Sequence, residues 1–178
     1  MIVAMFPGQG AQAVGMGRAL AESHEPARRA FEEADDVLGW SVSRLCFEGP
    51  IEELTATDAC QPALLTASIA AFRAAADAGF EPGMMMGHSL GEYSALVAAG
   101  AMTFAEGLAI VAERGAAMRA AGRDAPGAMA ALLGLSDEDA RALAAEAGEA
   151  WPANYNCPGQ VVVSGSVEAI DRVLELAS

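Results

Sequence analysis

The sequence contains no lysine, and all ten of its basic residues are arginines. This absence excludes Schiff-base catalysis and a Walker-type phosphate site, because both need a lysine amine. Acidic residues number 24, which gives a formal net charge of −14. Contact with nucleic acid phosphates needs a basic surface, so this charge argues against a nucleic-acid partner. An anionic ligand can still be held by a local arginine or by backbone N–H groups.

Cysteine is scarce as well, and its pattern bears on the compartment. Cys46, Cys60 and Cys157 are odd in number, widely spaced and outside any CxxC motif. Such thiols are typical of a reducing compartment rather than of a disulfide framework. The N-terminal stretch MIVAMF is too short for the apolar part of a signal peptide. No apolar run has transmembrane length, because His88 and Glu92 interrupt the best candidate. We therefore expect a cytoplasmic protein that binds no membrane.

The order of apolar runs and turn residues predicts an α/β protein whose pattern changes near residue 124. The hydrophobic fraction of 53% indicates a packed globular chain. The first part predicts strands at 2–6 and 83–87, and helices at 16–23, 25–38, 62–78, up to Ala99 and at 103–121. The second part predicts a strand at 127–135, a helix at 136–147, one or two strands within 155–166 and a helix at 167–177. We expect two subdomains, 1–124 and 125–178, the second with the order β-α-β-β-α.

A serine lies between two glycines at residues 87–91, GHSLG, which match the nucleophile-elbow pattern G-x-S-x-G. A serine on a sharp strand-to-helix turn projects its hydroxyl out of the sheet, and flanking glycines leave room for that backbone. The N–H of Leu90, at the start of the following helix, can face a developing oxyanion. The other interpretation is a tight turn whose serine only caps the next helix. An apolar run before the motif and a helical pattern after it favour Ser89 as a nucleophile.

A second glycine-rich loop follows the first predicted strand. Residues 8–13, GQGAQA, come close to the dinucleotide fingerprint G-x-G-x-x-A. That site needs an acidic residue at the end of a second strand, whereas the candidate acids Glu32, Glu33, Asp35 and Asp36 lie in a predicted helix. We therefore reject a dinucleotide site. The loop is either a plain turn or a neighbour of the serine turn, where Gln9 would supply a second oxyanion-hole N–H.

Arg114 lies on the helix that Thr103 and Glu106 open with capping-box spacing. None of the residues three or four positions away is acidic; they are Ile110, Val111, Ala117 and Met118. The usual ion pair along the helix is therefore not possible. Two outcomes stay open at this point, namely an ion pair with a distant acid and bidentate capture of a substrate carboxylate.

Five motifs in order carry a resemblance: FPGQGAQ, CQPALL, GHSLGEYSAL, AERGAAM and NYNCPGQVVVSG. Together the motifs resemble the N-terminal portion of the malonyl-CoA:acyl-carrier-protein transacylase family of fatty acid synthesis, and the likeness runs along the whole chain. One position departs from the family pattern, because Ala11 stands where serine is common. The alternatives are a serine hydrolase or thioesterase, an acyltransferase domain of a polyketide synthase, and a non-catalytic platform for acyl carrier protein or coenzyme A.

The resemblance implies an α/β-hydrolase-like large subdomain with a parallel sheet (1–124) and an incomplete ferredoxin-like small subdomain (125–178). It also implies a two-step acyl transfer without metal or cofactor. Ser89 would take the malonyl group from malonyl-CoA, and the phosphopantetheine thiol of acyl carrier protein would then accept it. The complete enzyme is expected to be a monomer.

Roles for individual residues also follow from the resemblance. The backbone N–H groups of Gln9 and Leu90 would form the oxyanion hole, and Arg114 would bind the free malonyl carboxylate. His88 and Gln61 would belong to the substrate-binding site.

The catalytic base is where the sequence departs from the family. That base is a histidine further along the chain, whereas this sequence holds only His24 and His88. His24 is expected to be exposed to solvent. His88 is adjacent to the nucleophile, and adjacent residues on an elbow point apart, so we do not expect it to deprotonate Ser89. A serine without its base loses most of its nucleophilicity. We therefore expect this chain alone to be weakly active or inactive, and to be part of a longer enzyme.

Overall fold

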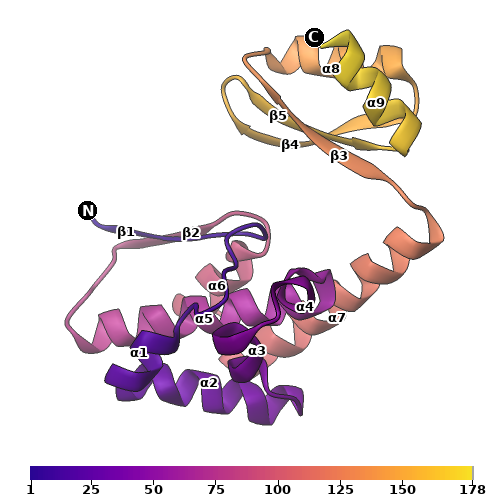
Figure 1. Cartoon of the computed structure of the whole chain (residues 1–178). Coiled ribbons are helices and arrows are strands. Elements are labelled where there is room, and N and C mark those ends of the chain that lie inside the picture. The colour runs from indigo at the N-terminus through magenta and orange to yellow at the C-terminus, as the bar shows by residue number, and fades with distance from the viewer. Residues whose placement is uncertain (178) are drawn as a thin grey trace. The chain divides into compact units, whose positions relative to one another are not determined.

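The structure is a computed structural model that describes residues 1–177. It divides into two compact units, Met1–Arg119 and the residues from Ala120 on, and Figure 1 shows the elements of each. The division falls inside α7 (Phe104–Asp124), after Arg119, whereas the boundary predicted from the sequence lies after residue 124. No helix among the described residues is long and apolar enough to cross a membrane.

The first unit holds a parallel pair of strands. β1 (Val3–Phe6) pairs with β2 (Met84–Gly87) so that Val3 lies opposite Met84 and Phe6 lies opposite Gly87. Both strands therefore end at the same edge of the sheet (Figure 1). The helices of the unit are α1 (Arg18–Ser23), α2 (Glu25–Leu38), α3 (Val42–Glu48), α4 (Ile51–Thr55), α5 (Thr57–Asp77), α6 (Gly91–Ala98) and α7.

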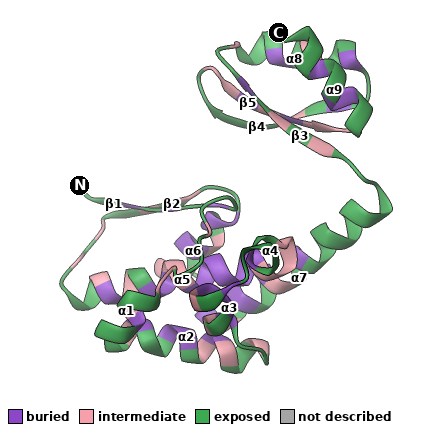
Figure 2. Cartoon of the chain, viewed as in Figure 1, coloured by how far each residue is buried: buried purple, intermediate pink, exposed green. Residues whose placement is uncertain are grey.

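The core of the first unit is built around α5. This helix buries Leu64, Leu65 and Ile69 against Phe31 of α2 and Leu108 of α7, and the burial along α5 is visible in Figure 2. Aliphatic and aromatic burial of this kind is the main favourable term in folding. The core thus fixes the position of α5 relative to α7.

The start of α5 differs from the prediction. We predicted a helix from residue 62 because proline is favoured in the first helical turn, but α5 begins at Thr57 and contains Pro62. Pro62 lacks the N–H that would bond to the carbonyl four residues earlier. Cys60 and Gln61 in this turn are fully buried. Tertiary packing therefore keeps the turn helical although the hydrogen bond from Pro62 is missing. The short helices α3 and α4 were not predicted either.

The second unit is an antiparallel sheet with two helices. Its elements are β3 (Ala128–Leu133), α8 (Asp137–Ala147), β4 (Ala150–Cys157), β5 (Gln160–Gly165) and α9 (Val167–Leu176), with strand order β3-β5-β4. Ser136 and Ser166 cap the two helices, because their hydroxyls accept hydrogen bonds from Asp139 N (3.1 Å) and Ala169 N (3.2 Å). The order β-α-β-β-α is confirmed. The predicted α/β fold class is confirmed as well, with a two-stranded parallel sheet in the first unit and a separate three-stranded antiparallel sheet in the second.

Candidate functional site

The serine turn, residues 87–91, connects β2 to α6 with a strained backbone. Ser89 has φ +52°, and it is the one non-glycine residue with positive φ in the part of the chain that the structure describes. Such a conformation costs free energy and is found mainly where function requires it. The predicted strand–turn–helix context of Ser89 is therefore present.

The glycines on both sides of Ser89 are required by close backbone contacts. A Cβ on Gly87 would lie 1.9 Å from the carbonyl carbon of Gly91, and a Cβ on Gly91 would lie 2.2 Å from the carbonyl oxygen of Phe6. No side chain fits at either position. Leu90 anchors the turn from the other side, because its side chain is buried in the core of the first unit.

The N-terminal loop, which we define as residues 7–13, lies against the serine turn. His88 N donates a hydrogen bond to Phe6 O (3.1 Å), and a Cβ on Gly8 would lie 2.7 Å from His88 O. Both parallel strands end here, which is the edge where ligand sites of α/β sheets gather. Of the two interpretations of the loop, the structure therefore shows the neighbour of the serine turn. The Gln9 side chain points toward α5, with its Nε2 3.5 Å from Thr57 Oγ1.

Arg114 reaches the serine from α7. Its Nη2 donates to Ser89 Oγ at 3.2 Å, and its Nη1 donates to Gln61 Oε1 at 2.6 Å. The guanidinium carbon also lies 5.8 Å from the centroid of the Tyr93 ring, within cation–π range. Among residues 1–177, no carboxylate forms an ion pair with Arg114. The distant ion pair that the sequence left open is thus not formed.

Gln61 lies behind Arg114 and away from solvent. Its exposed fraction is 0%, and its Nε2 donates to Met118 Sδ at 3.2 Å. Sequence reasoning brought Ser89, Arg114 and Gln61 to one site, but it missed Tyr93 and Met118. Met118 could have been found by spacing, since it is four residues after Arg114 on the same helix. Tyr93 meets Arg114 across two helices, which no local pattern reports.

The two histidines occupy different places. His24 lies between α1 and α2, where its Nδ1 is 2.8 Å from Ser23 Oγ, and it is exposed as expected. His88 is exposed on the serine turn, and its Nδ1 faces Gly8, since a Cβ there would lie 3.0 Å away.

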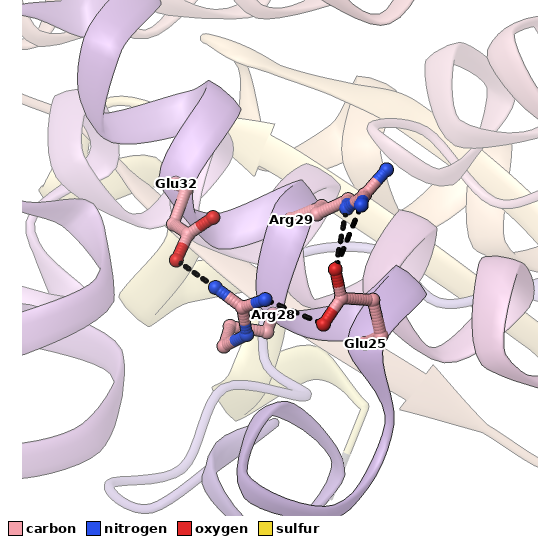
Figure 3. Close-up of polar contacts among 4 residues, drawn as sticks. All are labelled: Glu25, Arg28, Arg29 and Glu32. Carbon is pink, nitrogen blue, oxygen red and sulfur yellow. Dashed lines mark hydrogen bonds and ion pairs between the residues drawn. The ribbon is translucent and has the colours of Figure 1, made fainter.

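The four acids considered for a dinucleotide site, Glu32, Glu33, Asp35 and Asp36, do not lie at the end of a strand. They lie on α2, which confirms the helix predicted there. Figure 3 shows the ion pairs of this helix, in which Arg28 bridges Glu25 and Glu32 while Arg29 also contacts Glu25. In residues 1–177, no group of three or more histidine, cysteine, aspartate or glutamate side chains is arranged to hold a metal ion.

Chemically, the site places an uncompensated guanidinium beside a serine hydroxyl. Its five N–H donors can hold a carboxylate in two parallel hydrogen bonds, and the serine oxygen lies within reach of a group attached to that carboxylate. The positive charge of Arg114 is a local feature of the site, in contrast to the large negative net charge of the protein as a whole.

Comparison with known proteins places the chain in a family. Residues 3–178 match the acyl transferase domain family. The malonyl CoA-acyl carrier protein transacylase of Bacillus subtilis (strain 168) is 46% identical over 180 residues, which cover 99% of this chain and 57% of that protein. This chain thus spans little more than half the length of that relative.

Solved structures agree with this match. The acyl-carrier-protein S-malonyltransferase of Burkholderia pseudomallei 1710b is 44% identical, with a TM-score of 0.91, over 99% of this chain and 59% of that one. A malonyl-transacylase solved in complex with its type II polyketide synthase acyl-carrier protein is 41% identical, with a TM-score of 0.91, over 99% of this chain and 59% of that chain. The chain belongs to the acyl transferase domain family.

Proposed function

We propose that this chain carries the nucleophile and the carboxylate-binding residue of an acyltransferase that moves malonyl groups from malonyl-CoA to acyl carrier protein in fatty acid synthesis. The observation that carries the proposal is the 3.2 Å contact between Arg114 Nη2 and the oxygen of a serine with φ +52°. The names of the relatives, malonyl transacylases and malonyltransferases, support the choice of acyl group and acceptor.

The first step is acylation of Ser89. The Oγ atom attacks the thioester carbonyl of malonyl-CoA, an O–C bond forms, the C–S bond breaks, and coenzyme A leaves as the thiol with the proton. The N–H groups of Gln9 and Leu90 are proposed to hold the oxyanion, because the N-terminal loop and the start of α6 meet at the serine turn. In the second step the sulfur of the phosphopantetheine thiol attacks the ester carbonyl of malonyl-serine. A C–S bond forms, the C–O bond to Ser89 breaks, and Ser89 Oγ takes the proton of the thiol.

Arg114 is proposed to bind the free carboxylate of the malonyl group. Without substrate its Nη2 donates to Ser89 Oγ, which is a neutral acceptor. A bound carboxylate is charged and would accept stronger hydrogen bonds from the guanidinium. His88 is exposed beside Gly8, and we propose that it contacts the substrate at the rim of the site.

The proton of Ser89 needs an acceptor that Arg114 cannot provide. A guanidinium stays protonated at any physiological pH and offers donors only. We therefore infer slow acylation by this chain on its own, sustained by the oxyanion hole and binding alone. The cytoplasmic location and the monomeric state stay predictions.

Intact mass spectrometry after long incubation with malonyl-CoA tests the proposal. We expect one slowly formed malonyl adduct, which peptide mapping places on Ser89 and which Ser89→Ala lacks. Holo acyl carrier protein added afterwards should receive the label, whereas a hydrolase would release it to water. An adduct that persists in Ser89→Ala, or a parent chain that neither binds malonyl-CoA nor forms an adduct, would refute the proposal.

A further inference from the structure

Gln61 is a wholly buried amide whose two ends are both engaged by α7. Its Oε1 accepts from Arg114 Nη1 at 2.6 Å, and its Nε2 donates to Met118 Sδ at 3.2 Å. Burying an amide is unfavourable unless its polar atoms are bonded. Both contacts span more than 50 residues of sequence, because α5 supplies Gln61 and α7 supplies the other two.

The chemistry of the two partners fixes which way the amide points. A thioether sulfur accepts weakly and donates nothing, whereas a guanidinium donates and accepts nothing. The reversed amide would set its NH₂ donors against the donors of Arg114 and its oxygen against a sulfur without protons. Met118 therefore keeps Oε1 directed at Arg114.

We propose that Gln61 is a positioning residue that acts through Arg114 rather than a contact of the substrate. It holds Nη1 from behind, which leaves Nη2 directed at Ser89 and at any carboxylate bound there. Its neutrality matters as much as its geometry, because a glutamate in its place would hold the guanidinium equally well but cancel the charge that attracts a carboxylate. This inference rests on the proposed role of Arg114 in binding a malonyl carboxylate.

The test compares the affinities of the whole chain for malonyl-CoA and acetyl-CoA by isothermal titration calorimetry. The preference ratio, malonyl over acetyl, is the readout, since general damage to the fold lowers both affinities together. The variants are Gln61→Met, Gln61→Glu and Arg114→Ala. Thr66→Val is the matched control, because Thr66 is also buried on α5, and its hydroxyl donates to Pro62 O of the same helix rather than to a residue of the site.

We expect Gln61→Met to lower the preference ratio roughly tenfold, the value of one hydrogen bond to a charged group. Gln61→Glu should lower it at least as much, although its carboxylate still holds Arg114, and Thr66→Val should leave it unchanged. A preference retained in both Gln61 variants but lost in Arg114→Ala would overturn the inference and leave the proposed function intact. A parent chain without preference, or an Arg114→Ala chain that keeps it, would overturn both. A loss in Thr66→Val as well would show that the effect comes from the helix and not from Gln61.

Discussion

The α-carbon of Gly91 lies so close to the backbone of Phe6 that a Cβ on Gly91 would be 2.2 Å from the Phe6 carbonyl oxygen. This contact ties the first residue of α6 to the last residue of β1, although 85 positions separate them in the sequence. The same Cβ would lie 2.9 Å from the carbonyl oxygen of Pro7, so the serine turn packs directly against the end of β1 and the start of the N-terminal loop.

Gly91→Ala is expected to destabilise the protein by about 3 kcal/mol or more, because backbone atoms of β1 cannot move aside as a flexible side chain can. Urea unfolding followed by circular dichroism measures this free energy. Gly122→Ala is the matched control, since Gly122 lies in α7 with nothing within 4 Å of an added Cβ. Alanine there should be neutral or stabilising by about 0.5–1 kcal/mol. Equal stability of the two variants would contradict the close contact.

Much of this site could be predicted from the sequence because its signals are local. The GHSLG motif with its flanking strand and helix is visible within a few residues, and so is the absence of an acid three or four positions from Arg114 along its helix. The contact between Gln61 and Arg114 is not local, since it depends on how α5 packs against α7. No pattern within either helix reports that packing.

The same distinction explains the errors in the fold. β4 begins at Ala150, five residues before the predicted 155, and it contains Pro152. Proline indicates the end of a strand in sequence reasoning, yet an edge strand tolerates it because one side of the strand needs no donor. β4 is an edge strand in the order β3-β5-β4, and its register shifts next to Pro152. Strand order is a tertiary property that the sequence does not reveal locally.

Arg114→Lys separates the geometry of the carboxylate site from its charge. Lysine keeps the positive charge but loses the planar fork that holds a carboxylate by two parallel bonds. We expect malonyl-CoA binding to weaken roughly tenfold and acetyl-CoA binding to stay unchanged, as measured by calorimetry. Arg29→Lys is the control, because Arg29 pairs with Glu25 on the exposed face of α2. Parent-like malonyl-CoA affinity in Arg114→Lys would argue against bidentate capture.

The capping box that opens α7 is expected to give a pH-dependent contribution to stability. Glu106 Oε2 accepts from Thr103 N and Thr103 Oγ1, both at 2.8 Å, and these bonds hold the pKa of Glu106 below its usual 4.5. Because the folded-state pKa is the lower one, this stabilisation is present above pH 4.5 and is lost as the pH falls through the folded-state value. Glu106→Gln should therefore melt at a lower temperature than the parent at pH 7. The difference should vanish at strongly acidic pH, and a difference that is independent of pH would contradict the assignment.

The three thiols are expected to differ sharply in reactivity. Burial raises the pKa of Cys46 from 9.0 to about 12, with smaller contributions from Asp35 and Cys60, and burial raises the pKa of Cys60 to about 11. Cys157 is exposed. Since the thiolate is the reactive form, an aromatic disulfide reagent at pH 8 should modify Cys157 alone in the native protein and all three thiols after unfolding.

The buried thiols also predict how stability changes in alkaline solution. Their folded-state pKa values exceed the ordinary 9.0, so the unfolded chain releases these protons first as the pH rises. The stabilisation is fully present below pH 9 and is lost progressively as the pH approaches 11. Substituting Cys46 and Cys60 by alanine should flatten this part of the curve of unfolding free energy against pH, whereas Cys157→Ala should leave its slope unchanged. A parent curve that stays flat between pH 9 and 11 would mean that solvent reaches both thiols in the folded protein.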